Sequence, residues 1–123
     1  MKNPPKILLV EDESIIAAGI KMLLQEHAYK VVSILSSGEE AVDFSIKKTP
    51  DIILMDIKLK GQINGIEASY RIRRQIDVPI IFLTGNSKLV TENDLSALKP
   101  CWVFPKLSPD WKLFETIDKA LHI

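Results

Sequence analysis

Ile52-Ile53-Leu54-Met55-Asp56 places four apolar side chains directly before one carboxylate. A short, uninterrupted apolar run bounded by turn residues predicts a strand that is buried on both faces, as in a parallel sheet. Gly61 and Gly65 follow in the next loop. Because open α/β sheets bind their ligands at the carboxyl ends of the strands, Asp56 is the first candidate for a functional residue.

The rest of the chain alternates this strand pattern with helical periodicity. Further strands are predicted at residues 6–10, 29–35, 78–83 and 102–104. Helices are predicted from Ser14, from Ser37 to about residue 48, at residues 66–75 and 87–98, and from Pro109 after a Ser108 N-cap. Short connections between alternating segments predict an α/β three-layer sandwich around a parallel sheet. We expect one domain over residues 1–123, with an ordered core at about residues 6–122 and an N-terminal extension at residues 1–5.

Charge and composition exclude several classes of protein. The 123 residues include 16 Lys and Arg and 16 Asp and Glu, so no basic field is available for direct nucleic-acid binding. The single cysteine, Cys101, cannot form an internal disulfide. The sequence has no apolar run of about 20 residues that could insert into a membrane, and its N-terminus lacks the apolar segment of a signal peptide. We therefore expect a cytoplasmic domain.

Polar and charged side chains follow four of the five predicted strands, namely Glu11, Asp12, Asp56, Thr84 and Lys106. Each could singly be a helix cap or a solvated surface group, but parallel strands end at the same edge of a sheet, which would bring all five together. Clustered carboxylates repel one another unless a cation joins them, and oxygen-only ligands favour a hard ion such as Mg²⁺. The combination suits phosphoryl transfer onto a carboxylate, which would yield an aspartyl phosphate.

Five segments resemble the receiver domain of two-component response regulators. They read LLVEDE at residues 8–13, ILMDIKLKG at 53–61, NGIE at 64–67, PIIFLTG at 79–85 and FPK at 104–106. The resemblance covers essentially the whole chain. It implies a flavodoxin-like, doubly wound sheet of five parallel strands in the order 2-1-3-4-5, with five helices.

The resemblance also assigns roles around Asp56, which would be the phospho-acceptor. Asp12 and Asp56 would bind Mg²⁺ directly together with the backbone carbonyl of Lys58, and Glu11 would contribute mainly through water. The loop after Asp56 departs from the family, because Gly65 lies one residue further away than in many members. We expect a locally different loop that retains the metal site.

Thr84 and Lys106 would bind the phosphoryl group, with Gly85 and Asn86 close to the phosphorylation site. Receivers obtain this group from a phosphohistidine of a sensor histidine kinase or phosphotransfer protein, or from small donors such as acetyl phosphate. A receiver catalyses only its own phosphorylation and slow dephosphorylation, and is not otherwise an enzyme. The resemblance further implies that phosphorylation changes the affinity for an output domain or partner at the face formed by the fourth helix, fifth strand and fifth helix.

Two departures affect the end of the fifth strand. Lys106 precedes Leu107 where most receivers have Lys-Pro, and since a cis bond to a non-proline residue costs about 3 kcal/mol, we predict a trans bond. Val103 stands where the family has its switch aromatic. Trp102 and Phe104 flank it and are expected on the opposite face of the sheet.

Other hypotheses stay open. These departures also suit a receiver-like interaction module that acts without phosphorylation. A nucleotide- or flavin-binding domain is disfavoured, because Glu11-Asp12-Glu13 stands where such domains place a phosphate-binding loop. Arg71, Arg73 and Arg74 are expected to form a solvated helix face.

Overall fold

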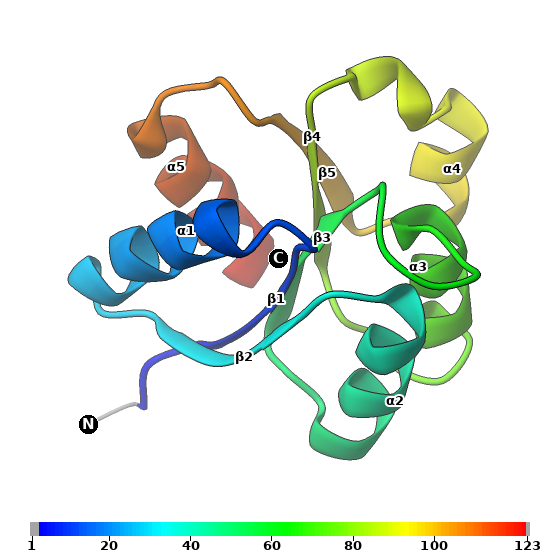
Figure 1. Ribbon diagram of the computed structural model, residues 1–123, viewed down its shortest axis with the longest axis horizontal. Coiled ribbons are helices and arrows are strands. Elements are labelled where there is room, and N and C mark those ends of the chain that lie inside the picture. The colour runs from blue at the N-terminus through cyan, green and yellow to red at the C-terminus, as the bar shows by residue number, and fades with distance from the viewer. Residues whose placement is uncertain (1–2, 123) are drawn as a thin grey trace.

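The computed structural model describes residues 3–122, which form a three-layer α/β sandwich (Figure 1). The strands are β1 (Lys6–Val10), β2 (Lys30–Leu35), β3 (Ile52–Asp56), β4 (Ile80–Thr84) and β5 (Cys101–Pro105). The helices are α1 (Ser14–Glu26), α2 (Gly38–Lys48), α3 (Gly65–Arg73), α4 (Glu92–Ala97) and α5 (Asp110–Leu121), with a 3₁₀ turn η1 (Ser87–Leu89). Residues 1 and 2 of the expected N-terminal extension, and residue 123, lie outside the described residues.

The sheet is parallel throughout and has the strand order β2-β1-β3-β4-β5, which confirms the predicted architecture. Helices α1 and α5 cover one face, while α2, α3 and α4 cover the other (Figure 1). No helix within residues 3–122 has the length and apolar character needed to cross a bilayer.

Strand β3 occupies the centre of the sheet, between β1 and β4. All five of its residues are buried. Ile53 and Met55 pack with the core under α2 and α3, and Ile52 and Leu54 pack with the core under α1 and α5. Burial on both faces explains why the run is apolar at every position rather than at alternate ones.

The predicted helix at residues 87–98 is wrong, because the segment is divided into η1 and α4. Val90 has an extended backbone and is buried in the core, and Thr91 is the N-cap of the helix that follows. The Thr91 hydroxyl accepts a hydrogen bond from the Asp94 N–H, and the Asp94 carboxylate accepts one from the Thr91 N–H, both at 3.1 Å. The Tyr70 hydroxyl of α3 also donates to Asp94, at 2.7 Å, and so attaches α4 to α3.

The start of α5 also differs from the prediction by one position. Pro109 is the N-cap and Asp110 is the first helical residue, whereas Ser108 was predicted to cap a helix that began at Pro109. The Ser108 N–H donates to the carbonyl of Pro105 at 3.0 Å, which closes a turn immediately after β5. Because of this turn, the first helical residue is Asp110 rather than Pro109.

Arg73 does not belong to a solvated helix face as expected. Its guanidinium donates hydrogen bonds to three consecutive carbonyls between α4 and β5, those of Leu98, Lys99 and Pro100. Arg71 does remain half-exposed, and it forms an ion pair with Glu67 of the same helix, at 3.6 Å. One arginine of α3 therefore holds the α4–β5 connection in place.

We expect Arg73→Ala to lower the free energy of unfolding by about 1–3 kcal/mol, because it removes charge-assisted hydrogen bonds to three carbonyls. Arg71→Ala is the matched control and should cost less than about 0.5 kcal/mol, as surface pairs within one helix do. Urea denaturation measures both values. Equal losses in the two variants would contradict the bridging role of Arg73.

Candidate functional site

The carboxyl ends of β1, β3, β4 and β5 surround a cleft of about 600 Å³. The polar and charged groups that line it include Asp12, Asp56, Lys58, Thr84, Asn86 and Lys106. The strand order brings these residues together, since the strand ends that carry them are neighbours at one edge of the sheet. The structure thus brings these residues together at one place.

Lys106 connects two carboxylates of this site. Its Nζ donates to Asp56 Oδ2 at 2.9 Å and to Glu11 Oε1 at 3.0 Å. Burial opposes the ammonium charge, but the two hydrogen bonds outweigh it and raise the pKa of Lys106. The lysine is therefore held as a cation beside Asp56.

Asp56 is held from a second direction by its own loop. Its Oδ1 accepts a hydrogen bond from the Ile57 N–H at 2.7 Å, so both carboxylate oxygens have a protein donor. Only 6% of the residue is exposed. A carboxyl group at this depth depends on these donors in place of water, and they also orient it towards the cleft.

Glu11 is more deeply buried than Asp56, at 2% exposure. Burial, followed by the neighbouring Asp56, raises the pKa of Glu11 to about 7, against the opposing hydrogen bond from Lys106. The Glu13 N–H donates to Glu11 Oε2 at 3.2 Å, and this hydrogen bond also lowers the pKa of Glu11. Three carboxyl groups thus share one lysine, and near neutral pH Glu11 carries only part of a negative charge.

Glu11, Asp12 and Asp56 each offer one oxygen, and these oxygens lie within 4.8 Å of one another. An excess of clustered oxygen ligands fits a hard divalent ion such as Mg²⁺. Lys58 also lines the cleft, where its backbone carbonyl is the predicted additional ligand. The residues present are therefore compatible with the predicted metal.

Thr84 lies at the cleft with 2% exposure, but its hydroxyl is engaged within its own loop. The hydroxyl donates to the Asn86 carbonyl at 2.9 Å and accepts from the Asn86 N–H at 3.0 Å. Gly85 lies between the two and also lines the cleft. The structure thus shows Thr84 bound to a neighbouring turn rather than to Asp56.

The end of β5 confirms both sequence predictions made for it. The one cis peptide bond within residues 3–122 joins Lys99 to Pro100, so the bond after Lys106 is trans. Trp102 and Phe104 pack on the α1–α5 side of the sheet, and Val103 packs on the opposite side. The family's switch aromatic therefore has no counterpart at Val103.

Gly65 is a structural requirement that the sequence pattern did not reveal. A Cβ atom at this position would lie 2.0 Å from the carbonyl oxygen of Asp56, and the Gly65 N–H donates to the Ile57 carbonyl at 2.7 Å. The start of α3 therefore lies directly against the phospho-acceptor candidate. A glycine in the loop after a strand-end acid was the available signal, although it indicates only a turn.

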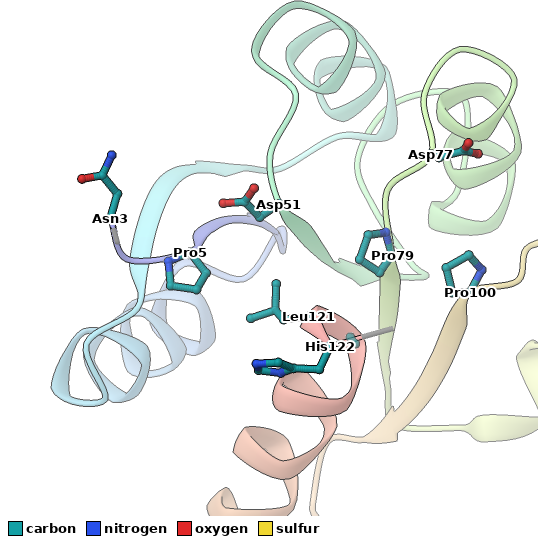
Figure 2. Close-up of a pocket in the computed structure, with 9 residues that line it drawn as sticks. Asn3, Pro5, Asp51, Asp77, Pro79, Pro100, Leu121 and His122 are labelled. Carbon is teal, nitrogen blue, oxygen red and sulfur yellow. The ribbon is translucent and has the colours of Figure 1, made fainter. Parts of the chain in front are cut away.

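A second hollow, of about 610 Å³, lies at the amino ends of the strands, opposite the cleft (Figure 2). Figure 2 shows the carboxylates of Asp51 and Asp77 well apart around it, and His122 at the end of α5. Asp51 is already engaged, since its carboxylate accepts a hydrogen bond from the Lys6 N–H at 2.7 Å. Within residues 3–122, the acidic cluster that could hold a metal is the one around Asp56.

Comparisons with known proteins agree with this geometry. Residues 7–99 match the response regulator receiver domain family. The chain is 41% identical over 93 residues to the response regulator UvrY of Escherichia coli, and 33% identical over 85 residues to the transcriptional regulatory protein PdtaR of Mycobacterium tuberculosis. These alignments cover 74% and 69% of this chain, and 40% and 41% of the relatives. The chain thus spans about two-fifths of their length.

A similar solved structure is the receiver domain of the sensor histidine kinase PA1611 from Pseudomonas aeruginosa PAO1, described with a magnesium ion coordinated in its active site cleft. It is 30% identical with a TM-score of 0.86, and the match covers 98% of this chain and 99% of that one. A doubly wound five-stranded sheet with an acidic cluster and a lysine at its carboxyl edge defines the receiver class of signalling domain. This chain belongs to the receiver domain family of two-component response regulators.

Proposed function

We propose that this receiver accepts a phosphoryl group on Asp56 from a phosphohistidine of a sensor histidine kinase or phosphotransfer protein, in a Mg²⁺-dependent reaction. The observation that carries the proposal is the 2.9 Å contact between Lys106 Nζ and Asp56, inside a cluster of three carboxylates. A receiver-like module without phosphorylation would have no need of this buried charge arrangement. Exchange with a kinase of this type would take place in the cytoplasm.

In the proposed reaction a carboxylate oxygen of Asp56 forms a bond to phosphorus. The phosphorus–nitrogen bond of the donor breaks, and its electron pair leaves with the histidine nitrogen. Lys106 offsets negative charge at the acceptor, and the Ile57 N–H holds the carboxylate in position. Small donors such as acetyl phosphate would react in the same way, with cleavage of a phosphorus–oxygen bond.

Asp12, Asp56 and the Lys58 carbonyl would bind Mg²⁺ directly, and Glu11 mainly through water. When bound, the ion would neutralise charge on the oxygens of the transferring phosphoryl group. The protein's own part is to bring oxygen ligands from β1 and β3 to one point. Beyond promoting its own phosphorylation and slow dephosphorylation, we propose no enzymatic turnover for the domain.

Thr84 would couple phosphorylation to a change of shape. Its hydroxyl carries one hydrogen, which is donated to the Asn86 carbonyl. To donate to a phosphoryl oxygen instead, Thr84 must give up that bond and release the turn that precedes η1. The resulting population shift would alter the α4–β5–α5 face, where an output domain or partner would bind.

The test is phosphorylation of the full chain by acetyl phosphate, followed by intact-mass spectrometry. We expect a single phosphoryl adduct in the presence of Mg²⁺ and none when EDTA removes the metal. Hydroxylamine should cleave the adduct, because it attacks acyl phosphates. An adduct that forms equally in EDTA or resists hydroxylamine would overturn the proposal.

A further inference from the structure

The loop between β3 and α3, residues 57–64, is attached to the beginning of α2. The Lys60 N–H donates to the carbonyl of Ser36 at 3.2 Å, and the Gln62 N–H donates to the Glu39 carboxylate at 2.8 Å. Residues 37 and 60 also form an isolated parallel bridge. The loop that follows Asp56 is therefore held by a neighbouring segment, in addition to its own closure through the Gly65 N–H.

Glu39 is fitted to this loop rather than merely near it. Gly61 has φ +94°, and a Cβ atom there would lie 2.5 Å from Glu39 Oε1, so the loop backbone approaches the carboxylate closely. The hydrogen bond from the Gln62 N–H, followed by one from the N–H of Glu39 itself and a smaller one from the Ile63 N–H, lowers the pKa of Glu39. An exposed carboxylate thus serves as a fixed acceptor for loop backbone N–H groups.

We propose that Glu39 is a positioning residue for the metal site, which holds the loop so that the Lys58 carbonyl faces the bound ion. The inference rests on the proposed function, because it concerns the proposed Mg²⁺ ligand Lys58. The backbone on either side of Lys58 is fixed, by the Ile57 N–H on Asp56 and by the Lys60 N–H on Ser36. Glu39 secures the next turn of the loop. Without Glu39, a smaller fraction of molecules would hold the Lys58 carbonyl in the position for binding, and the apparent affinity for Mg²⁺ would fall in proportion.

Glu40 provides a matched control in the same helical turn. Its carboxylate accepts hydrogen bonds from the hydroxyls of Ser37, at 2.9 Å, and Ser36, at 3.4 Å, which lie in its own segment. Both glutamates are exposed and both lie in the first turn of α2. Replacing either one with alanine removes one negative charge at nearly the same place.

The experiment is a titration of the full chain with MgCl₂ alone, measured by isothermal titration calorimetry. We expect Glu39→Ala to weaken Mg²⁺ binding about fivefold, which corresponds to the loss of one hydrogen-bonding anchor, and Glu40→Ala to weaken it less than about twofold. Glu39→Gln retains an acceptor oxygen and should bind Mg²⁺ nearly as well as the wild type. Amide hydrogen exchange at Gln62 should accelerate in Glu39→Ala but not in Glu40→Ala.

Equal weakening in Glu39→Ala and Glu40→Ala would show a charge effect only and would overturn the inference. An unchanged affinity in Glu39→Ala would do the same, while leaving the proposed function intact. A wild-type chain that binds no Mg²⁺ would overturn both. Affinity lost in Glu39→Gln as fully as in Glu39→Ala would exclude the hydrogen bond as the cause.

Discussion

The Asp56→Asn variant is expected to form no phosphoryl adduct with acetyl phosphate and Mg²⁺, a loss of more than about a hundredfold in the rate of phosphorylation. An amide is not a nucleophile towards phosphorus, and the substitution also removes one of the three clustered carboxylates. The neighbouring Lys106 keeps Glu11 as a partner, so the fold should persist. Intact-mass spectrometry over a time course measures the rate.

Asp77→Asn is the control for this experiment. Asp77 lines the hollow at the amino ends of the strands and takes no part in the cleft (Figure 2). This variant should be phosphorylated at the wild-type rate. An adduct that persists in Asp56→Asn would identify a different acceptor, for which Asp12 and Glu11 are the nearest carboxylates.

Gly65→Ala should have the largest effect on stability, with a loss of about 3 kcal/mol or more in the free energy of unfolding. The added methyl group would overlap the carbonyl oxygen of Asp56 at 2.0 Å and the Met55 side chain at 2.9 Å. The backbone cannot easily move away, because Asp56 ends the central strand and the Gly65 N–H is bound to Ile57. Urea denaturation measures the loss.

Gly19→Ala supplies the matching control within α1. A Cβ atom there would have no neighbour within 4 Å, and alanine favours a helix interior, so a gain of about 0.5–1 kcal/mol is expected. Opposite signs for the two substitutions would show that contact with Asp56, and not glycine loss as such, causes the destabilisation. A Gly65→Ala variant as stable as the wild type would mean that the approach of α3 to β3 is looser than the structure shows.

The parts of the fold that sequence alone predicts are those encoded by short-range patterns. The stretch at residues 52–56, four apolar residues and an acid, has the same bounds as β3, and the acid at its end lies at the site. Parallel strands share one edge for their carboxyl ends, so the meeting of Asp56 with Lys106 followed without any knowledge of strand order. The order itself came from the family resemblance, since periodicity does not say which strands are neighbours.

The parts that could not be predicted depend on contacts between distant segments or on side-chain rotamers. Nothing near Arg73 in sequence indicates that it reaches the carbonyls of residues 98–100. The engagement of the Thr84 hydroxyl by Asn86 depends on one side-chain torsion and on the turn that follows. Likewise, Glu39 in α2 and Gln62 in the next loop are 23 residues apart.

The attachment of α4 to α3 has a consequence for how the molecule opens. No residue of α4 is itself buried, and hydrogen bonds from Tyr70 and Arg73 hold the segment from both ends. Opening this segment breaks these hydrogen bonds and the half-buried contacts of Leu95, whereas β3 can separate only with loss of the whole core. We therefore expect the backbone amides of residues 92–97 to exchange with solvent faster than those of β3, which hydrogen exchange would measure.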